Sequence, residues 1–313
     1  MTQHAGDQEH GFLWRQEHLA PLPIPTGQAA SDLMNLIWRK NDVYLDIGSF
    51  PMAAGWMTLH MGTVLIGSII LWLAASGDYW LSLAFFILMG AGLMGTLWYF
   101  YIKQWRNPLT PPIRFNRQRR EACITRPDGS YWFVPWERVY AIAPSVTNLG
   151  TYGASQHGSL VLWFPLEGQI DEAYSETKEG WVMMVNPGGG RSSMAQWECI
   201  RSFMEVGPEA VPEPSVVRHH DMTIAQSFIT DFKDAVASKG WLLSLLWEGF
   251  AGIVVFNIPL YVYFARKKLA NLPDLTAPEA IEWSEPLTRE QWAKRTPELE
   301  SAIAQREEEL AIH

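Results

Sequence analysis

The residues that come closest to a catalytic or ligand-binding motif lie in two short polar stretches. Residues 186–191 read NPGGGR, but a phosphate-binding loop would also need a Lys before a Ser or Thr. That Lys is missing, so we expect a simple connection between a strand and a helix. His219, His220 and Asp221 would need further ligands at a suitable spacing to bind a metal, and the sequence offers none. We expect a polar loop there.

The composition argues against several classes of function. Neither a GxSxG nor an HExxH motif occurs, so no hydrolase or zinc-protease site is indicated. The net charge of −9 argues against nucleic-acid binding, which normally needs a basic surface. Cys123 and Cys199 lack metal-site or redox-pair spacing, so we expect two buried, small apolar side chains. The sequence predicts a non-enzymatic protein without cofactor or metal.

Two ionisable residues lie in apolar runs, where such residues are candidates for function. His60 is the only ionisable residue of its run, and it could reach the membrane interface or hydrogen-bond to a neighbouring helix. A proton relay would need an acidic partner at similar depth, and the next run has none. Glu248 is the stronger candidate, because a single carboxylate in an apolar run is costly. We predict His60 and Glu248 as intramembrane polar residues.

Long apolar runs must position these residues. Residues 56–76 and 80–102 are almost free of charge, and at about 1.5 Å per residue each spans the ~30 Å core of a bilayer. Only residues 77–79 connect them, which predicts a tight transmembrane hairpin. The preceding N-terminal residues lack both a basic start and an apolar core, so we expect the first run to direct membrane insertion.

Small residues mark the helix faces that could pack closely. Ala91 and Gly95 form a small-xxx-small pair in the second run, and Gly62 and Gly67 lie in the first. We predict helix packing within the hairpin through these four residues. Dimerisation through the same residues, giving a homo-oligomer, is the alternative.

Basic residues predict the orientation of the hairpin. The second run is followed, with no acid between them, by Lys103, Arg106, Arg114, Arg117, Arg119 and Arg120. Arg39 and Lys40 precede the first run, and the loop at 77–79 has no Lys or Arg. The positive-inside rule then puts both flanks in the cytoplasm. We also expect the basic flank to contact anionic lipid headgroups at the membrane interface.

A third apolar run, residues 241–264, is harder to interpret. The basic residues 266–268 follow it, and a single crossing would place them outside, against the charge rule. Gly249, Gly252 and Pro259 interrupt the helical pattern. We favour an interfacial or re-entrant segment that keeps the tail cytoplasmic, with a true third transmembrane span as the alternative.

The region between the apolar runs has the pattern of a small antiparallel β domain. Short apolar blocks predict strands near residues 113–115, 121–125, 131–135, 139–143, 159–164 and 181–185, with a hairpin turn at 126–129. Ser193 and Gln196 form a capping box, and Trp197, Ile200 and Met204 then share one helix face. Strands followed by one amphipathic helix have the order of a pleckstrin-homology-like domain.

The predicted fold class is therefore an α+β membrane protein in five parts. These are an N-terminal cytoplasmic segment (1–55), the transmembrane hairpin (56–102), the PH-like β domain with its helix (103–215), a helix with the third apolar segment (216–270) and an acidic helical tail (271–313). A capping box at Thr288 and Gln291 and a start at Thr296 predict helices in the tail. We expect a solvated, frayed helix there, with a docking surface for a basic partner as the alternative.

Three strings of the sequence carry a family resemblance. WRKNDVYLDI (38–47) precedes the hairpin, and IRFNRQRREACITRPDGSYWFVPWERV (113–139) and QWECIRSFMEVGP (196–208) follow it. Together they resemble an uncharacterised family of proteobacterial membrane proteins with a PH-like domain after a transmembrane hairpin. Members resemble neighbours of type VI secretion effectors, which implies an immunity or accessory role. The resemblance supplies no catalytic residues.

These expectations combine into one leading hypothesis. The protein would be a non-enzymatic, multi-pass protein of the bacterial inner membrane, with most of the chain cytoplasmic. It would bind a protein partner and protect against a type VI secreted toxin that attacks the membrane. The alternative is an accessory anchor that recruits a secretion component or anionic lipid.

Overall fold

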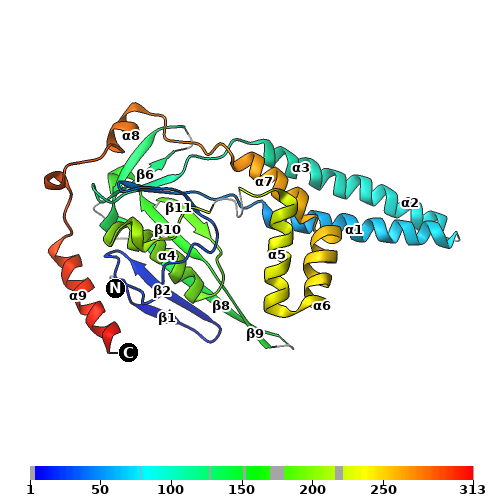
Figure 1. The fold of residues 1–313 in the computed structure, drawn as a ribbon, viewed down its shortest axis with the longest axis horizontal. Helices are drawn as coiled ribbons and strands as arrows, with labels where there is room; N and C mark the ends of the chain where they lie inside the picture. Colours follow the sequence, from blue (N-terminus) through cyan, green and yellow to red (C-terminus); the bar gives the residue numbers. More distant parts are fainter. Residues whose placement is uncertain are drawn as a thin grey trace. The chain divides into compact units, whose positions relative to one another are not determined.

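The computed structural model describes residues 4–77, 79–126, 128–150, 153–169, 180–215 and 221–312. The chain forms two compact units. Unit 1 comprises Met1–Ser49, Pro111–Val216 and Pro273–His313, and unit 2 comprises Phe50–Thr110 and Val217–Leu272. Unit 1 is thus assembled from three stretches of sequence that the helices of unit 2 separate (Figure 1).

The larger sheet of unit 1, sheet A, is antiparallel. Its strands, in spatial order, are β1 (Gln8–His10), β2 (Trp14–Ala20), β8 (Tyr140–Gly150), β10 (Leu160–Pro165) and β11 (Gly180–Val185), and β9 (Gly153–Gly158) pairs with β8. Trp14 lies opposite Val146, and Val161 lies between Ile142 and Met184. Directly opposed residues share a face, so these side chains form rows across the sheet.

The second sheet, sheet B, joins sequence from both sides of the apolar hairpin. Its order is β3 (Ile37–Lys40), β4 (Tyr44–Ile47), β5 (Ile113–Asn116), β6 (Glu121–Thr125) and β7 (Tyr131–Pro135), all antiparallel. Strand β4 precedes the hairpin and β5 follows it, and Leu45 pairs with Phe115. Both residues are fully buried, so this junction belongs to the core of unit 1.

Helix α4 (Gly190–Glu205) closes the core of unit 1. The predicted apolar face is confirmed, because Trp197, Ile200 and Met204 are buried. Trp136 stacks on Trp197 with ring centroids 5.3 Å apart. The capping box predicted at Ser193 is wrong, because the helix begins at Gly190 and its N-cap is Gly189. Short 3-10 turns lie at Trp136–Arg138, Glu167–Gln169 and Pro208–Ala210.

The tail folds back onto unit 1. It contains α8 (Pro278–Trp283), a 3-10 turn (Arg289–Gln291) and α9 (Pro297–Ala311). Leu275 and Trp283 pack around Cys123, and Leu299 and Ile303 of α9 are buried. The predicted helix start at Thr296 is confirmed, since its side chain accepts from the Leu299 N–H. The burial of Leu299 and Ile303 contradicts the expectation of a solvated, frayed helix.

Unit 2 is helical. Its elements are α1 (Ala53–Ser76), α2 (Trp80–Met89), a π-helical segment (Gly90–Met94), α3 (Gly95–Arg106), α5 (Ile224–Lys239), α6 (Trp241–Ser244), a second π-helical segment η5 (Leu245–Val255) and α7 (Ile258–Leu269). Among the described residues, helices 53–76 and 80–106 are long and apolar enough to cross a membrane. Helices 241–255 and 258–269 pass the same test only as a pair, which is bent by 65°.

The coarse fold prediction is confirmed, with one addition. The chain is α+β, with antiparallel strands after two long apolar helices. The addition is that residues 1–55, which we predicted as a separate segment, supply β1 to β4 of the two sheets. Three predicted features fall partly outside the described residues, at Pro127 in the turn, Asp78 in the hairpin loop and His219–His220 in the polar loop.

Candidate membrane interface and partner surface

The helices α1 to α3 expose apolar side chains over most of their surface. Leu71 is 72% exposed and Leu88 is 73% exposed. At the loop end, the exposed rings of Trp72 and Tyr79 stack with centroids 6.2 Å apart. A soluble helix of this length keeps a polar face toward water, whereas lipid favours an apolar surface all round. This surface is therefore suited to a bilayer.

The helices of the hairpin pack through small residues, but only partly through the predicted ones. A Cβ added to Gly62 would lie 3.1 Å from the Met94 side chain, so Gly62 is at the contact. Ala91 is exposed, and Gly67 and Gly95 face open space, so the prediction is wrong for these three. The π-helical segment at 90–94 interrupts the regular α-helical spacing that the prediction assumed for Ala91 and Gly95, whereas Gly67 lies on the uninterrupted helix α1.

His60 lies in an aromatic cluster of unit 2. Its ring is 4.6 Å from Trp56 and 5.0 Å from Trp98, measured between centroids. Trp56 is buried, and its indole N–H donates to the Phe256 carbonyl at 2.9 Å. The cluster therefore connects the start of α1, the first turn of α3 and the bend before α7.

Glu248 has a cationic partner. The Lys239 ammonium at the end of α5 forms an ion pair with the Glu248 carboxylate on η5. The bend that follows is set by Asn257, which adopts the left-handed region with φ +47°. The carboxylate that looked isolated in the sequence is thus neutralised by the neighbouring helix.

The predicted basic flank divides into exposed and buried residues. Lys103 and Arg106 are exposed in the last turn of α3. Arg117 and Arg119 are half-buried and donate to carbonyls of unit 1.

Arg114 and Arg120 require a correction. Both are buried in unit 1 and hydrogen-bond to carboxylates, so neither can contact lipid headgroups. Their acidic partners lie far away in the sequence. A count of the charges near the second apolar run therefore does not include these partners.

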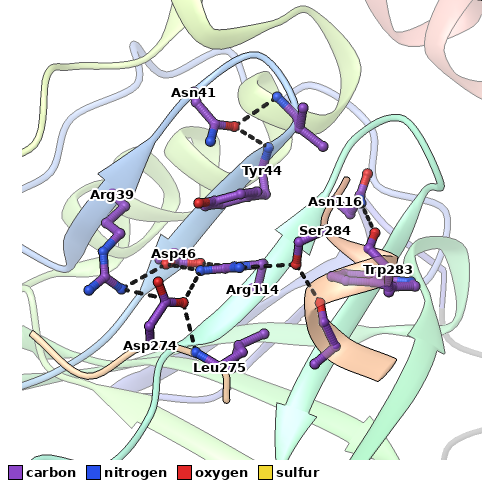
Figure 2. Close-up of polar contacts among 12 residues, drawn as sticks. Arg39, Asn41, Tyr44, Asp46, Arg114, Asn116, Asp274, Leu275, Trp283 and Ser284 are labelled. Atoms are coloured by element: carbon purple, nitrogen blue, oxygen red, sulfur yellow. Dashed lines mark hydrogen bonds and ion pairs between the residues drawn. The ribbon is translucent and has the colours of Figure 1, made fainter. Parts of the chain in front are cut away.

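Arg114 is the centre of the Asp46 cluster, which we define as Arg39, Asp46, Arg114, Asp274 and Ser284. The guanidinium of Arg114 donates to both oxygens of Asp46, at 2.6 and 2.8 Å, and to Asp274 at 2.7 Å. Arg39 donates to Asp46 at 3.2 Å, and Ser284 accepts from Arg114 at 3.0 Å. Figure 2 shows Arg114 between the two carboxylates, with the Tyr44 ring over it. The two arginines balance the two aspartates.

The electrostatics of this cluster are strongly coupled. Burial alone would lower the pKa of Arg114, but the hydrogen bonds and charge of Asp46 outweigh it and raise that pKa. Burial alone would raise the pKa of Asp274, but the Leu275 N–H and the two arginines lower it. Both groups are therefore held in their charged forms. The cluster joins two residues before the hairpin, one after it and two after α7, which are Arg39 and Asp46, Arg114, and Asp274 and Ser284.

A second buried network, the Glu205 cluster, comprises Arg120, Trp136, Glu137, Glu205 and Arg295. Glu205 accepts from Arg120 at 2.8 Å, from Trp136 at 2.7 Å and from Arg295 at 2.6 Å. Burial alone would raise the pKa of Glu205, but Arg120, Trp136 and Arg295 lower it. The cluster ties the tail to α4, so it stabilises unit 1 rather than forming an open site.

Sheet A presents an apolar strip on the face away from α4. We define this strip as Trp14, Ile142, Val146, Val161, Val182 and Met184. Val182 and Met184 on the edge strand are exposed, as are Trp14 and Val146, which lie two rows along the same face, beyond Gln16 and Pro144. Their neighbours along each strand point inward, as Met183 and Val185 do. Within the described part of the chain, four of the six side chains of the strip are exposed, so the strip is an exposed apolar surface of unit 1.

Comparison of the chain with family models, curated proteins and solved structures found no match.

The polar groups nearest to a cavity also serve structural roles. A cavity of about 110 Å³ is lined by His18, Glu17 and Arg306, among others. His18 is buried, its Nδ1 shares a 2.8 Å hydrogen bond with the Tyr140 hydroxyl, and its Nε2 is 3.3 Å from Glu9. Among the described residues, no group of His, Cys, Asp and Glu is placed to hold a metal ion.

Proposed function

We propose that this chain is a membrane-anchored binding protein of the bacterial inner membrane. Helices α1 to α3 anchor it, and the apolar strip of sheet A binds a protein partner. The strip carries the proposal, because a soluble surface rarely leaves several large apolar side chains together without a partner. Burial of each such side chain contributes about 1.5–3 kcal/mol. In this proposal the protein is not an enzyme.

The charge pattern supports a cytoplasmic location for unit 1. Lys103 and Arg106 are exposed at the end of α3, while the loop at 77–79 has no Lys or Arg. Basic residues stay on the cytoplasmic side of the membrane. The hairpin would then cross twice, and the strip would face cytoplasmic proteins close to the membrane.

The resemblance supplies the class of partner. The strings at 38–47, 113–139 and 196–208 resemble proteins beside type VI secretion effectors, which supports an immunity role. We propose that the strip binds a membrane-active toxin where it reaches the cytoplasmic face and so blocks assembly of its pore. Anchoring keeps the strip near the membrane, which raises its effective concentration for an inserted toxin.

Co-expression with the toxin encoded beside this protein tests the proposal. The wild-type chain should restore growth of a sensitive strain. The double variant Val182→Glu, Met184→Glu puts charges into the strip and should lose protection. Val206→Glu is the matched control, because Val206 is equally exposed but lies outside the strip. Killing that is unchanged by the wild-type chain contradicts the immunity role.

The accessory role remains a second candidate, because Lys103, Arg106 and Lys267 are exposed. In this role the protein recruits a secretion component or anionic lipid. Deleting the gene would then reduce secretion of type VI substrates without changing toxin resistance. The immunity role predicts that deleting the gene removes toxin resistance and leaves secretion of type VI substrates unchanged.

A further inference from the structure

The three stretches of unit 1 fold into one body, and this constrains the path of the chain. Leu45 before the hairpin pairs with Phe115 after it, and Asp46 binds Arg114. After α7, Asp274 binds the same Arg114, and the Trp283 carbonyl accepts from Asn116 at 2.9 Å. A folded domain does not span a bilayer, because its polar backbone and charges would be unsatisfied there. All three stretches must therefore lie on one side.

It follows that residues 217–272 return to the side that they left. A single crossing by the third apolar run is excluded. Two crossings would need α5 as the second span. Helix α5 has 16 residues, about 24 Å in length, and carries Asp231, Lys233 and Asp234 near its middle. It is too short and too charged for a ~30 Å hydrocarbon core.

Contacts within unit 2 agree with this path. The Lys268 ammonium at the end of α7 donates to the Asn107 carbonyl, just after α3, at 2.6 Å. Arg266 donates to the Met222 carbonyl just before α5. The start of α5, the end of α7 and the end of α3 thus lie together, at the level of the exposed Lys103 and Arg106. In Figure 1, α5 and α6 run across the direction of α1 to α3 rather than along it.

We propose that α5, α6 and η5 lie in the plane of the membrane, within the leaflet on the side of unit 1, and that lipid acyl chains cover the exposed apolar face of residues 241–254. This inference rests on the proposed membrane anchoring. Trp241, Trp247 and Phe250 are each about 60% exposed, whereas Ser244 and Gly252 of the same segment are buried. A face this apolar continues the lipid-facing surface of the hairpin.

Charges at the edges of this segment fit the headgroup region. Lys239 forms an ion pair with Glu248, so the carboxylate of Glu248 lies in the leaflet as a neutralised group. Lys267 is exposed, and Lys268 lies beside it at the end of α7. Cationic side chains at this depth attract anionic headgroups. The apolar face and the basic end together indicate a lipid monolayer rather than a protein as the occupant.

Labelling of single cysteines in the full chain tests the path. Burial raises the pKa of both native thiols, Cys123 and Cys199, to about 12, so both stay protonated and unreactive in the folded protein. Tyr79→Cys, Ser238→Cys and Glu308→Cys introduce exposed thiols in the hairpin loop, before the α5–α6 turn and in α9. A membrane-impermeant maleimide is added to intact spheroplasts and then to permeabilised ones.

The expected result is labelling of Tyr79→Cys in intact spheroplasts, and of Ser238→Cys and Glu308→Cys only after permeabilisation. Labelling of Ser238→Cys in intact spheroplasts, with Glu308→Cys still protected, overturns this inference and leaves the anchor standing. Protection of Tyr79→Cys in intact spheroplasts overturns the anchor and the inference together.

A fluorescent label identifies what covers the apolar face. An environment-sensitive dye on Leu246→Cys should be quenched by nitroxide lipids and protected from aqueous iodide. The same dye on Ser238→Cys, at the exposed end of α5, is the control and should be quenched by iodide. Iodide quenching at Leu246→Cys shows water on this face, and protection from both quenchers shows a protein cover. Either result overturns the inference.

Discussion

Arg114 is a charged side chain that unit 1 holds almost completely out of water. A buried guanidinium is tolerated because Asp46 receives two of its hydrogen bonds and Asp274 receives a third. Removing one member of such a pair leaves the other charge buried and uncompensated. The stability of unit 1 therefore depends on the Asp46 cluster.

Replacement of Arg114 tests that dependence. Arg114→Gln should lower the free energy of unfolding by about 3–5 kcal/mol, because Asp46 keeps its charge without its bidentate partner. Urea unfolding of the full chain in detergent, followed by tryptophan fluorescence, measures the change. Arg106→Gln is the matched control at an exposed site, and its unfolding curve should overlay the wild type. Equal curves for both variants would contradict the structural role of Arg114.

The charged state of Glu205 makes the stability of unit 1 depend on pH. Its pKa lies below the ordinary 4.5, so at low pH the unfolded chain binds a proton more readily than the folded chain does. The stabilisation is complete above pH 4.5 and is lost as the pH falls through the lowered value. Glu205→Gln should flatten this part of the profile of melting temperature against pH. Glu307→Gln, at an exposed site, should retain the wild-type profile. Identical slopes of melting temperature against pH in the wild type and both variants would contradict this role of Glu205.

Residue chemistry was only partly predictable from the sequence. Cys123 and Cys199 were expected as buried apolar side chains, and both are buried. Arg114 and Arg120 were misassigned to the basic flank, because Asp46 and Glu205 lie 68 and 85 residues away. Local charge counting carries no information about such distant pairs.

At the scale of elements, Met94, the last residue of the π-helical segment at 90–94, packs against one of the two glycines predicted on α1. Gly62 contacts Met94, whereas Gly67 faces open space. Gly62→Leu should therefore destabilise the hairpin by about 1–3 kcal/mol through overpacking. Gly67→Leu adds the same side chain without a clash and should leave the melting temperature unchanged. Thermal unfolding in one detergent compares the two, and equal destabilisation would contradict the observed packing.

Elements differ in how well the sequence predicts them. The long apolar helices were predictable because their pattern is local and extends over more than 20 residues. Strand β1 has three residues and β3 and β4 have four each, too few for a clear alternation. Strand β4 is defined by a partner across the hairpin, as Leu45 pairs with Phe115, whereas β1 and β3 pair with the neighbouring strands β2 and β4. Residues 1–55 therefore looked like a loose segment.

At the scale of the whole molecule, unit 1 is complete only when the last stretch of the chain has joined it. Leu275 and Trp283 cover Cys123, and Asp274 completes the Asp46 cluster. Truncation after Leu272 should thus expose Cys123 to thiol reagents under native conditions. Mass spectrometry after maleimide treatment should find Cys123 modified in the truncated chain and unmodified in the full chain. Cys199, a buried residue of α4, reports whether the rest of unit 1 stays folded.

The same three-stretch assembly gives the protein its proposed topology. If unit 1 is one cytoplasmic body, each excursion of the chain into the membrane must return to it. The tail and the N-terminal strands then share one compartment, and the hairpin loop lies in the other. Partners of the apolar strip and of the tail would be met on the same side.

The most direct test of this account compares two reporters in the full chain. Alkaline phosphatase folds only outside the cytoplasm, where its disulfides form, and green fluorescent protein exported by the general secretory route stays dark. With phosphatase inserted after Gly77 and green fluorescent protein fused after His313, the account predicts high phosphatase activity together with bright fluorescence. An inactive phosphatase or a dark C-terminal fusion would contradict it.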